Sequence, residues 1–160
     1  MNYHFEKTDT TKLKHTMAAA YAGVWSIESR AMLPLSRDRL RNFPLSIFLF
    51  DDNKYTPPLG HIGISQVEQG QAVVGGFVVD PNHRGEGLGY TMLKNLLSTV
   101  DAEIPGIETC TSNVNTETVE LFVRAGGVVA GSRTPLAITG CNTIIDLSSA
   151  IERNGQGVQA

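Results

Sequence analysis

The sequence is poor in cysteine and contains no long hydrophobic run. Only Cys110 and Cys141 occur among 160 residues, in apolar surroundings and without the spacing of metal ligands. A disulfide framework would need more cysteines, so we expect two buried free thiols on strands. No apolar run approaches the roughly 18 residues of a spanning helix, and residues 1–7 lack the apolar core of a signal peptide. These absences predict a cytoplasmic protein with no membrane partner.

Positive charge is also scarce. The chain has 13 Lys and Arg against 16 Asp and Glu, a net charge of −3 at pH 7. Non-specific nucleic-acid binding needs a basic field, so we expect no nucleic-acid partner. One local exception, at Arg30, Arg37, Arg39 and Arg41, fits either a solvated helix face or a phosphate patch.

The apolar pattern predicts an α/β (α+β) fold in a single domain at residues 1–150, followed by a flexible tail at residues 151–160. The strands are expected at residues 2–8, 45–50, 59–69, 71–80, 107–113, 128–131 and 143–147. The helices are expected at residues 12–29, 36–42, 90–100 and 115–125. The second to fourth strands form an antiparallel meander. One sheet of mixed direction with helices on both faces is the natural packing of this order.

A glycine-rich turn organises the chain. The apolar strand ends at Asp80-Pro81, and Asn-His-Arg-Gly-Glu-Gly-Leu-Gly leads into the next helix. The glycines at 85, 87 and 89 lack the Cβ atoms that would keep a ligand off the backbone, and free N–H groups at a helix start bind anions. We expect a phosphate-bearing ligand here, although glycines also serve purely steric ends. A dinucleotide fingerprint is disfavoured because its last glycine would be out of register.

The turn closely resembles a known signature. Arg84-x-x-Gly87-x-Gly89 after a hydrophobic strand is similar to the acyl-CoA signature of the Gcn5-related N-acetyltransferase (GNAT) family. The resemblance covers about residues 2–148 and implies the GNAT acyl-CoA N-acyltransferase fold, with a mixed, mostly antiparallel sheet of six to seven strands. It implies acetyl-CoA as cosubstrate, no metal, and direct attack by a primary amine of a small molecule or a protein N-terminus. Homodimers are common in the family.

The resemblance also implies which residues hold CoA. The backbone of Phe77, Val78 and Val79 pairs with the pantetheine arm, where this strand splays away from the next one. The amides of the turn hold the pyrophosphate, and the turn comprises Arg84, Gly85, Glu86, Gly87, Leu88 and Gly89. The guanidinium of Arg84 suits phosphate oxygens, whereas the carboxylate of Glu86 is expected to face solvent.

Two adjacent glycines interrupt the strand just upstream. Gly75 and Gly76 weaken a strand, and glycine there often marks a bulge or a close approach of another group. The alternative is that the pair only makes room for a bulky neighbour.

A second family motif resembles residues 115–126. Asn115 would cap a helix and bond the pantetheine amide, and a plain helix cap is the alternative. Phe122 lies where the family usually has a tyrosine that protonates the leaving thiolate, so this position can line the CoA site but cannot supply a proton. Gly127 replaces the usual aromatic residue. These departures motivate a second hypothesis, a catalytically impaired CoA-binding or regulatory module.

The usual general base is also missing, since the strand before the turn begins with residues 71–74, which are not ionisable. The nearest titratable side chains are Glu68 and His61, and either could equally be an ordinary sheet residue. An amine needs a base or a water chain before it attacks a thioester. A backbone N–H of Val78 or Val79 would polarise the thioester carbonyl.

Overall fold

The computed structural model describes residues 3–7, 42–52, 58–132 and 143–153. Its strands are β1 (Tyr3–Lys7), β2 (Leu45–Asp51), β3 (Gly60–Glu68), β4 (Gln71–Val79), β5 (Thr109–Val114), β6 (Val128–Ser132) and β7 (Thr143–Asp146). Its helices are α3 (Leu88–Glu103) and α4 (Val119–Arg124), with 3₁₀ turns at Pro81–His83, Thr116–Thr118 and Ser148–Ala150. The helices expected at 12–29 and 36–42, the arginine cluster and Cys141 lie outside the described residues, apart from Asn42.

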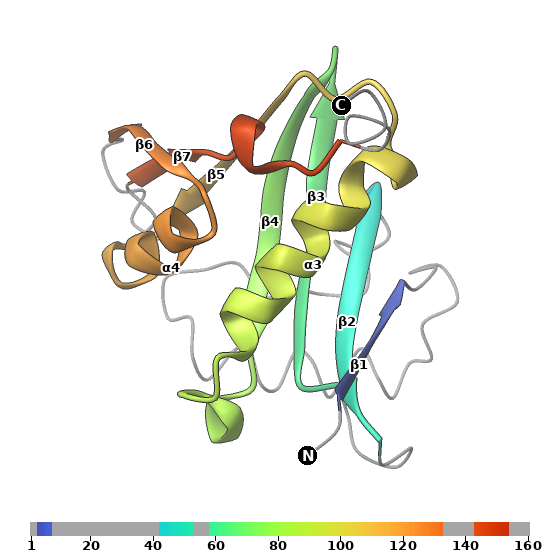
Figure 1. The fold of residues 1–160 in the computed structure, drawn as a ribbon, viewed down its shortest axis with the longest axis vertical. Coiled ribbons are helices and arrows are strands. Elements are labelled where there is room, and N and C mark those ends of the chain that lie inside the picture. The colour runs from blue at the N-terminus through green and yellow to red at the C-terminus, as the bar shows by residue number, and fades with distance from the viewer. Residues whose placement is uncertain (1–2, 8–41, 53–57, 133–142, 154–160) are drawn as a thin grey trace, which may run out of the picture.

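The seven described strands form one sheet in the order β1-β2-β3-β4-β5-β7-β6 (Figure 1). Strands β1 to β4 pair antiparallel, as do β5, β7 and β6. Only β4 and β5 run parallel. The predicted meander and the mixed, mostly antiparallel sheet are therefore confirmed.

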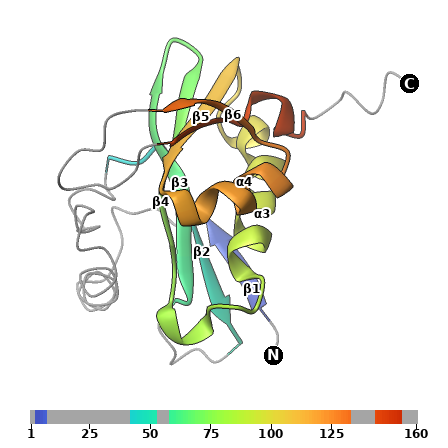
Figure 2. The same cartoon turned by 90° about the vertical axis from the view of Figure 1, so that its left-hand side faces the viewer.

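Helix α3 crosses one face of the sheet, and α4 lies on the same side beside it (Figures 1 and 2). The helical spacing of the apolar residues of α3 explains this placement, since they form one stripe toward the sheet. All members of that stripe are buried, namely Leu88, Met92, Leu93, Leu96, Leu97 and Val100. The helix extends beyond the predicted 90–100 at both ends, from the left-handed Gly87 to Ile104.

Strand β2 is buried on both of its faces. Leu45, Ile47 and Leu49 join the core beneath α3, while Ser46 and Phe48 point to the opposite face and are also buried. Such a strand reads as a continuous apolar run, which is what the sequence displays apart from Ser46. The one polar residue in this run therefore needs a buried hydrogen-bond partner.

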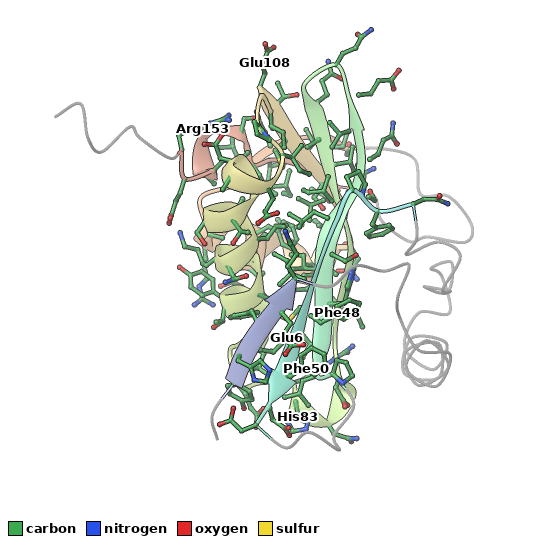
Figure 3. The ribbon with its side chains drawn as sticks, turned by 90° about the vertical axis from the view of Figure 1, so that its right-hand side faces the viewer. Glu6, Phe48, Phe50, His83, Glu108 and Arg153 are labelled. Carbon is green, nitrogen blue, oxygen red and sulfur yellow. The ribbon has the colours of Figure 1, made fainter. Side chains whose placement is uncertain are left out.

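The C-terminal segment packs against α3 beyond residue 150, where the sequence placed the end of the domain. Ile151 is buried, and the amide of Glu152 donates to the carbonyl of Leu97 at 3.0 Å. Arg153 donates to the carboxylate of Asp101 and to the carbonyl of Ile107. The packed part of the chain thus reaches at least Arg153, which Figure 3 labels beside the helix.

Cys110 is a buried free thiol on β5, as predicted. Burial and then the nearby Asp146 carboxylate raise the pKa of Cys110 to about 12, against a smaller opposing effect of Arg153. A thiol with this pKa carries almost no thiolate at pH 7. In the described parts of the chain, no helix combines the length and apolarity needed to cross a membrane.

Candidate active site

The chain turns sharply as it leaves β4. The amide of Asp80, one residue past the end of β4, donates to the carbonyl of Leu59 at 2.7 Å. The carboxylate of Asp80 then accepts from the amide of Asn82 at 2.9 Å and caps the 3₁₀ turn Pro81–His83. Proline fits the start of such a turn because its missing N–H is not needed there. The Asp80-Pro81 pair therefore directs the chain from the strand into the glycine-rich segment.

Glycine occupies positions of the turn for two different structural reasons. Gly85 and Gly87 have φ angles of 81° and 78°, and a Cβ at either position would meet nothing within 4 Å. At Gly89 a Cβ would lie 2.9 Å from Phe77 Cζ and 3.1 Å from Leu121 Cδ1. The expectation that all three glycines clear space for a ligand is thus corrected, because Gly89 allows close packing of α3 on β4 and α4.

The N-terminus of α3 is open to an anion. Gly87 is the N-cap, it offers no side-chain hydrogen bond, and the first turn carries no acidic residue. The first backbone N–H groups of a helix have no partner within the helix and carry a partial positive charge. With open space above Gly85 and Gly87, this end of α3 fits a phosphate group.

Arg84 ties the turn back to the strand. Its Nε and Nη2 both lie 3.4 Å from the carbonyl oxygen of Val79, to which they donate. The amide of Asp80 points toward β3, so in a planar trans peptide the Val79 carbonyl points the opposite way. In an extended strand the N–H of Val79 lies on that same side. Arg84 therefore lies at the edge of β4 that faces away from β3.

The Glu86 carboxylate is engaged by two neighbours. The hydroxyl of Tyr3 on β1 donates to Glu86 Oε2 at 3.4 Å, and His83 Nδ1 lies 3.3 Å from the same oxygen. Partial desolvation, followed by the Glu86 carboxylate, raises the pKa of Tyr3. The side chain of Glu86 is 42% exposed, so it faces solvent as predicted while also contacting the first strand.

Beyond residue 74 the edge of β4 that faces β5 is left without a strand partner in the described structure. Strand β4 pairs with β5 only over residues 71–74 and 109–112. The last residues of β5, Asn113 and Val114, pair with β7 on their other side. In Figure 1 β4 continues toward the glycine turn past the end of β5. Among the described residues, the backbone of residues 75–79 therefore has no strand partner on this edge, which agrees with the expected splaying of the two strands.

A bulge lies inside this unpaired stretch. His61 faces Val78 and Gly63 faces Gly75, so Ile62 of β3 stands opposite both Gly76 and Phe77. Gly76 has a φ of 65°, a conformation typical of glycine in a bulge. A Cβ on Gly76 would lie 2.9 Å from the ring of His61. The two sequence interpretations, a bulge and a bulky neighbour, therefore both hold.

His61 is fully buried beneath the bulge. Its Nδ1 lies 2.8 Å from the carbonyl oxygen of Gly76, and its Nε2 lies 3.0 Å from Ser46 Oγ. Burial lowers the pKa of His61 to about 4, although the bond to Gly76 opposes the shift. The imidazole is therefore neutral at pH 7. Sequence reasoning missed Ser46, for which the signal was a lone hydroxyl in an apolar strand.

Glu68 is not brought to the glycine turn. It is exposed at the end of β3 and pairs with Gln71 next to the hairpin turn. That turn contacts the start of β5, because the carbonyl of Gly70 accepts from the amide of Glu108. Figure 3 labels Glu108 and His83 at opposite ends of the molecule. The two candidate bases thus occupy different regions, and only His61 lies near the unpaired edge of β4.

Asn115 and Phe122 bring α4 to this region. The Oδ1 of Asn115 accepts from the amide of Thr118 at 3.0 Å and from its hydroxyl, so the predicted cap is present, although it caps the 3₁₀ turn Thr116–Thr118 that leads into α4. Phe122 is fully buried, and its ring meets that of Phe77 edge-on at 5.5 Å. The position where a tyrosine was expected therefore packs directly against the unpaired part of β4.

Tyr90 and Arg124 form a contact that sequence reasoning did not anticipate. Tyr90 lies in the first turn of α3, and the guanidinium of Arg124 from α4 lies 5.1 Å from the centre of its ring. This cation–π contact joins the two helices beside the glycine turn. Among the residues that the structure describes, no three His, Cys, Asp or Glu side chains gather to hold a metal ion.

A model of the Acetyltransferase (GNAT) family matches residues 11–126, more than half of the chain. The chain belongs to the GNAT acetyltransferase family. The family predicted from the two motifs is thereby confirmed, and the protein is an acetyltransferase. A comparison of this GNAT chain with curated proteins finds no match.

Solved structures share the fold of this GNAT chain. The ribosomal-protein-S18-alanine N-acetyltransferase from Escherichia coli has a TM-score of 0.64 at 21% identity, covering 97% of each chain. The spermidine/spermine N-acetyltransferase from Vibrio cholerae, solved in mutant forms, has a TM-score of 0.67 at 15% identity, covering 90% of each chain. The ribosomal-protein-S5-alanine acetyltransferase from Vibrio fischeri reaches 0.70 at 11% identity, covering 90% of this chain and 91% of the other. At these identities the likeness establishes the acyltransferase fold.

Proposed function

We propose that this GNAT protein transfers an acetyl group from acetyl-CoA to a primary amine of a small molecule or a protein N-terminus. The observation that carries the proposal is the junction of two features on one strand. The unpaired backbone of residues 75–79 leads directly to the open glycine turn and the N-terminus of α3. A ligand that joins an amide-containing arm to a pyrophosphate would use both features, the strand edge for the arm and the glycine turn for the pyrophosphate.

The residues at this junction fit acetyl-CoA. The pantetheine arm contains two amides, which can bond to an unpaired strand edge in the way an added peptide strand does. The pyrophosphate fits the uncapped amides of the helix start, with the Cβ-free surface of Gly85 and Gly87 above it. Arg84 adds a positive charge at the end of the strand. Asn115, whose Oδ1 is used as a helix cap, keeps its side-chain N–H₂ to offer the arm.

The proposed chemistry rests on positioning rather than on a dedicated acid and base. The amine attacks the thioester carbonyl, the C–S bond breaks, and the thiolate leaves with the electron pair. Holding the two groups together removes much of the entropic barrier. The N–H of Val79, on the open edge of β4, is the donor we assign to the carbonyl oxygen as it becomes negative. The proton of the amine passes to water, since Glu68 is distant and His61 is hydrogen-bonded through both nitrogens.

The alternative is a CoA-binding module with impaired catalysis. The observation that favours it is Phe122, a fully buried ring without a hydroxyl at the position where the family motif usually has a proton donor. A thiolate is nevertheless a fair leaving group without protonation, so we place this alternative second.

The test is a release assay for free thiol with acetyl-CoA and a panel of amines. The structural neighbours are named for an alanine of ribosomal proteins and for spermidine and spermine, so the panel includes peptides with a free N-terminal alanine as well as polyamines. We expect acetyl-CoA to bind and at least one amine to release thiol. Binding without turnover on any amine would favour the module. Absence of binding in calorimetry would overturn both.

A further inference from the structure

The bulge that brings β4 to the glycine turn is held by a buried histidine. We propose that His61 is a positioning residue for acetyl-CoA, which fixes the bulge at Gly76 and thereby aims the backbone of residues 77–79 at the pantetheine arm. The inference rests on the proposed function, because it assigns a role within that same site. In this role His61 acts through its hydrogen bond to β4 and not as a general base.

The hydrogen bonds around His61 define its tautomer. The Gly76 carbonyl can only accept, so Nδ1, 2.8 Å away, must carry the proton. In the neutral ring Nε2 then has a lone pair, and the hydroxyl of Ser46 donates to it at 3.0 Å. A chain of two hydrogen bonds, each donated in the same direction, therefore runs from Ser46 on β2 through His61 on β3 to Gly76 on β4. It links three neighbouring strands through side-chain bonds in addition to their backbone ladders.

The sequence provides a niche for this ring on two strands. A Cβ on Gly63 would lie 3.3 Å from His61 Cε1, and one on Gly76 would lie 2.9 Å from both Cε1 and Nδ1. Aromatic rings close the niche, with Phe48 4.7 Å and Phe43 5.7 Å from the imidazole between ring centres. The imidazole thus fills, together with the ring of Phe43, the space that the two glycines leave open.

The consequence for the site follows from the period of a strand. Side chains alternate between the two faces, so a change of one residue in register exchanges the faces. The bulge at Gly76 resets that alternation, and as a result Phe77 packs on Phe122 while the carbonyl of Val79 points to the open edge. Without the bond from His61, the partly buried Gly76 carbonyl loses this hydrogen bond, and the bulge loses an interaction that favours it over a regular ladder.

The geometry argues against His61 as the base itself. Both ring nitrogens are occupied, one by a carbonyl and one by a hydroxyl, and the side chain is fully buried. A general base must come within hydrogen-bond reach of the proton that it removes. The bond to Gly76 places His61 behind the backbone that would contact the substrate, which suits positioning.

Three substitutions separate the possible roles. In His61→Asn the side-chain amide nitrogen occupies the place of Nδ1 and can still donate to Gly76, although much of the ring volume is lost. In His61→Phe the ring volume is kept and the donor is removed, and His61→Leu is a second donorless variant. The control is Ser65→Ala, since Ser65 also lies on β3 and donates to a carbonyl of β4, that of Val73 rather than Gly76, at the separate register shift between Ile64 and Gln66.

We expect the hydrogen-bond donor at position 61, rather than the volume of the side chain, to determine the affinity for acetyl-CoA. His61→Phe and His61→Leu should raise the Kd for acetyl-CoA about tenfold or more, with a matching rise in KM. His61→Asn and Ser65→Ala should stay within about threefold of the parent protein, measured well below their melting temperatures. Equal or greater loss in His61→Asn than in His61→Phe would show that the ring only fills space. A fall in kcat at unchanged Kd in all three variants, with loss of the acidic limb of the pH–rate profile, would identify a base and overturn the proposal.

A further measurement needs neither a variant nor CoA. In ¹⁵N-labelled protein, two-bond nitrogen–proton correlations distinguish the two neutral tautomers of a histidine. We expect His61 to carry its proton on Nδ1 at pH 7, with or without ligand. A proton on Nε2 would overturn the inference even if the protein acetylates amines. The Nδ1 tautomer in a protein that binds no CoA would instead leave the hydrogen bond from His61 to Gly76 in place and refute the proposed function.

Discussion

The ring of Phe122 meets the ring of Phe77 edge-on, with 5.5 Å between the centroids and 78° between the planes. This contact joins α4 to the part of β4 that has no partner on the side of β5. It also means that the position of the missing proton donor lies beside the backbone that we assign to acetyl-CoA. We therefore expect a hydroxyl added at Phe122 to reach the candidate site.

Phe122→Tyr tests whether the leaving thiolate lacks a proton donor. A positioned general acid typically contributes about 10²-fold or more, so we expect kcat to rise at least about tenfold with little change in the Kd for acetyl-CoA. The measurement is steady-state release of thiol at saturating substrate. Phe122→Leu, which adds no hydroxyl, is the control and should give no rise. An unchanged kcat in Phe122→Tyr would show that protonation of the thiolate does not limit the reaction.

Gly87→Glu tests the glycine turn as the phosphate site. Gly87 and Gly106 both have positive φ angles, 78° and 88°, and open space where a Cβ would be. Gly106→Glu is thus a matched control, with the same left-handed strain of about 1–2 kcal/mol outside the turn. We expect similar falls in melting temperature for both variants and loss of acetyl-CoA binding in Gly87→Glu alone. Equal affinities in calorimetry would show that the turn is not the site.

Glu68→Gln tests the assignment of the second candidate base. Glu68 lies at the hairpin end of β3, far from the turn, so its carboxylate cannot reach an amine at the open edge of β4. We expect kcat and KM to change by less than about twofold, which is within the usual effect of surface substitutions. A loss of kcat with a shifted acidic limb in the pH–rate profile would contradict the placement.

The free energy of unfolding should depend on pH through His61. The pKa of this buried group is lowered from 6.5 to about 4, so the unfolded chain binds more protons between these values. The stability that His61 contributes is full above pH 6.5 and is lost as the pH falls toward 4, by about 3 kcal/mol in total. Urea unfolding from pH 4 to 7 should show this slope. It should be absent in His61→Asn, and an equal slope in both proteins would mean that another group is responsible.

The elements that local sequence determines were predicted well. The continuous apolar run of β2, the stripe that begins at Leu88, and the cap at Asn115 all depend on residues a few positions apart. The glycine pair before Phe77 correctly marked an irregularity in β4, because only glycine fits its backbone and its crowded surroundings. The strands, helices and turns that depend on neighbouring residues could therefore be predicted from the sequence.

Interactions between distant residues were not readable in this way. Ser46 meets His61 through the register of β2 on β3, and that register is not encoded in either strand alone. Likewise, Gly89 is small because of Phe77 and Leu121, which no motif reports. Glu68 was proposed as a base for its chemistry, although its place beside the hairpin turn separates it from the site. Which polar groups meet is decided by long-range packing, and the sequence supplied only the candidates.

The single parallel pairing in the sheet has a mechanical consequence. Two antiparallel blocks, β1 to β4 and β5 with β7 and β6, meet along a seam of four residue pairs between β4 and β5. Past that seam the blocks are joined through contacts such as those of α4 with β4 rather than by a backbone ladder. An extended arm bonded to residues 77–79 would lengthen the seam as a partial eighth strand. Bound acetyl-CoA would then extend the backbone pairing of β4 beyond the seam, and release of CoA would leave that edge of β4 unpaired again.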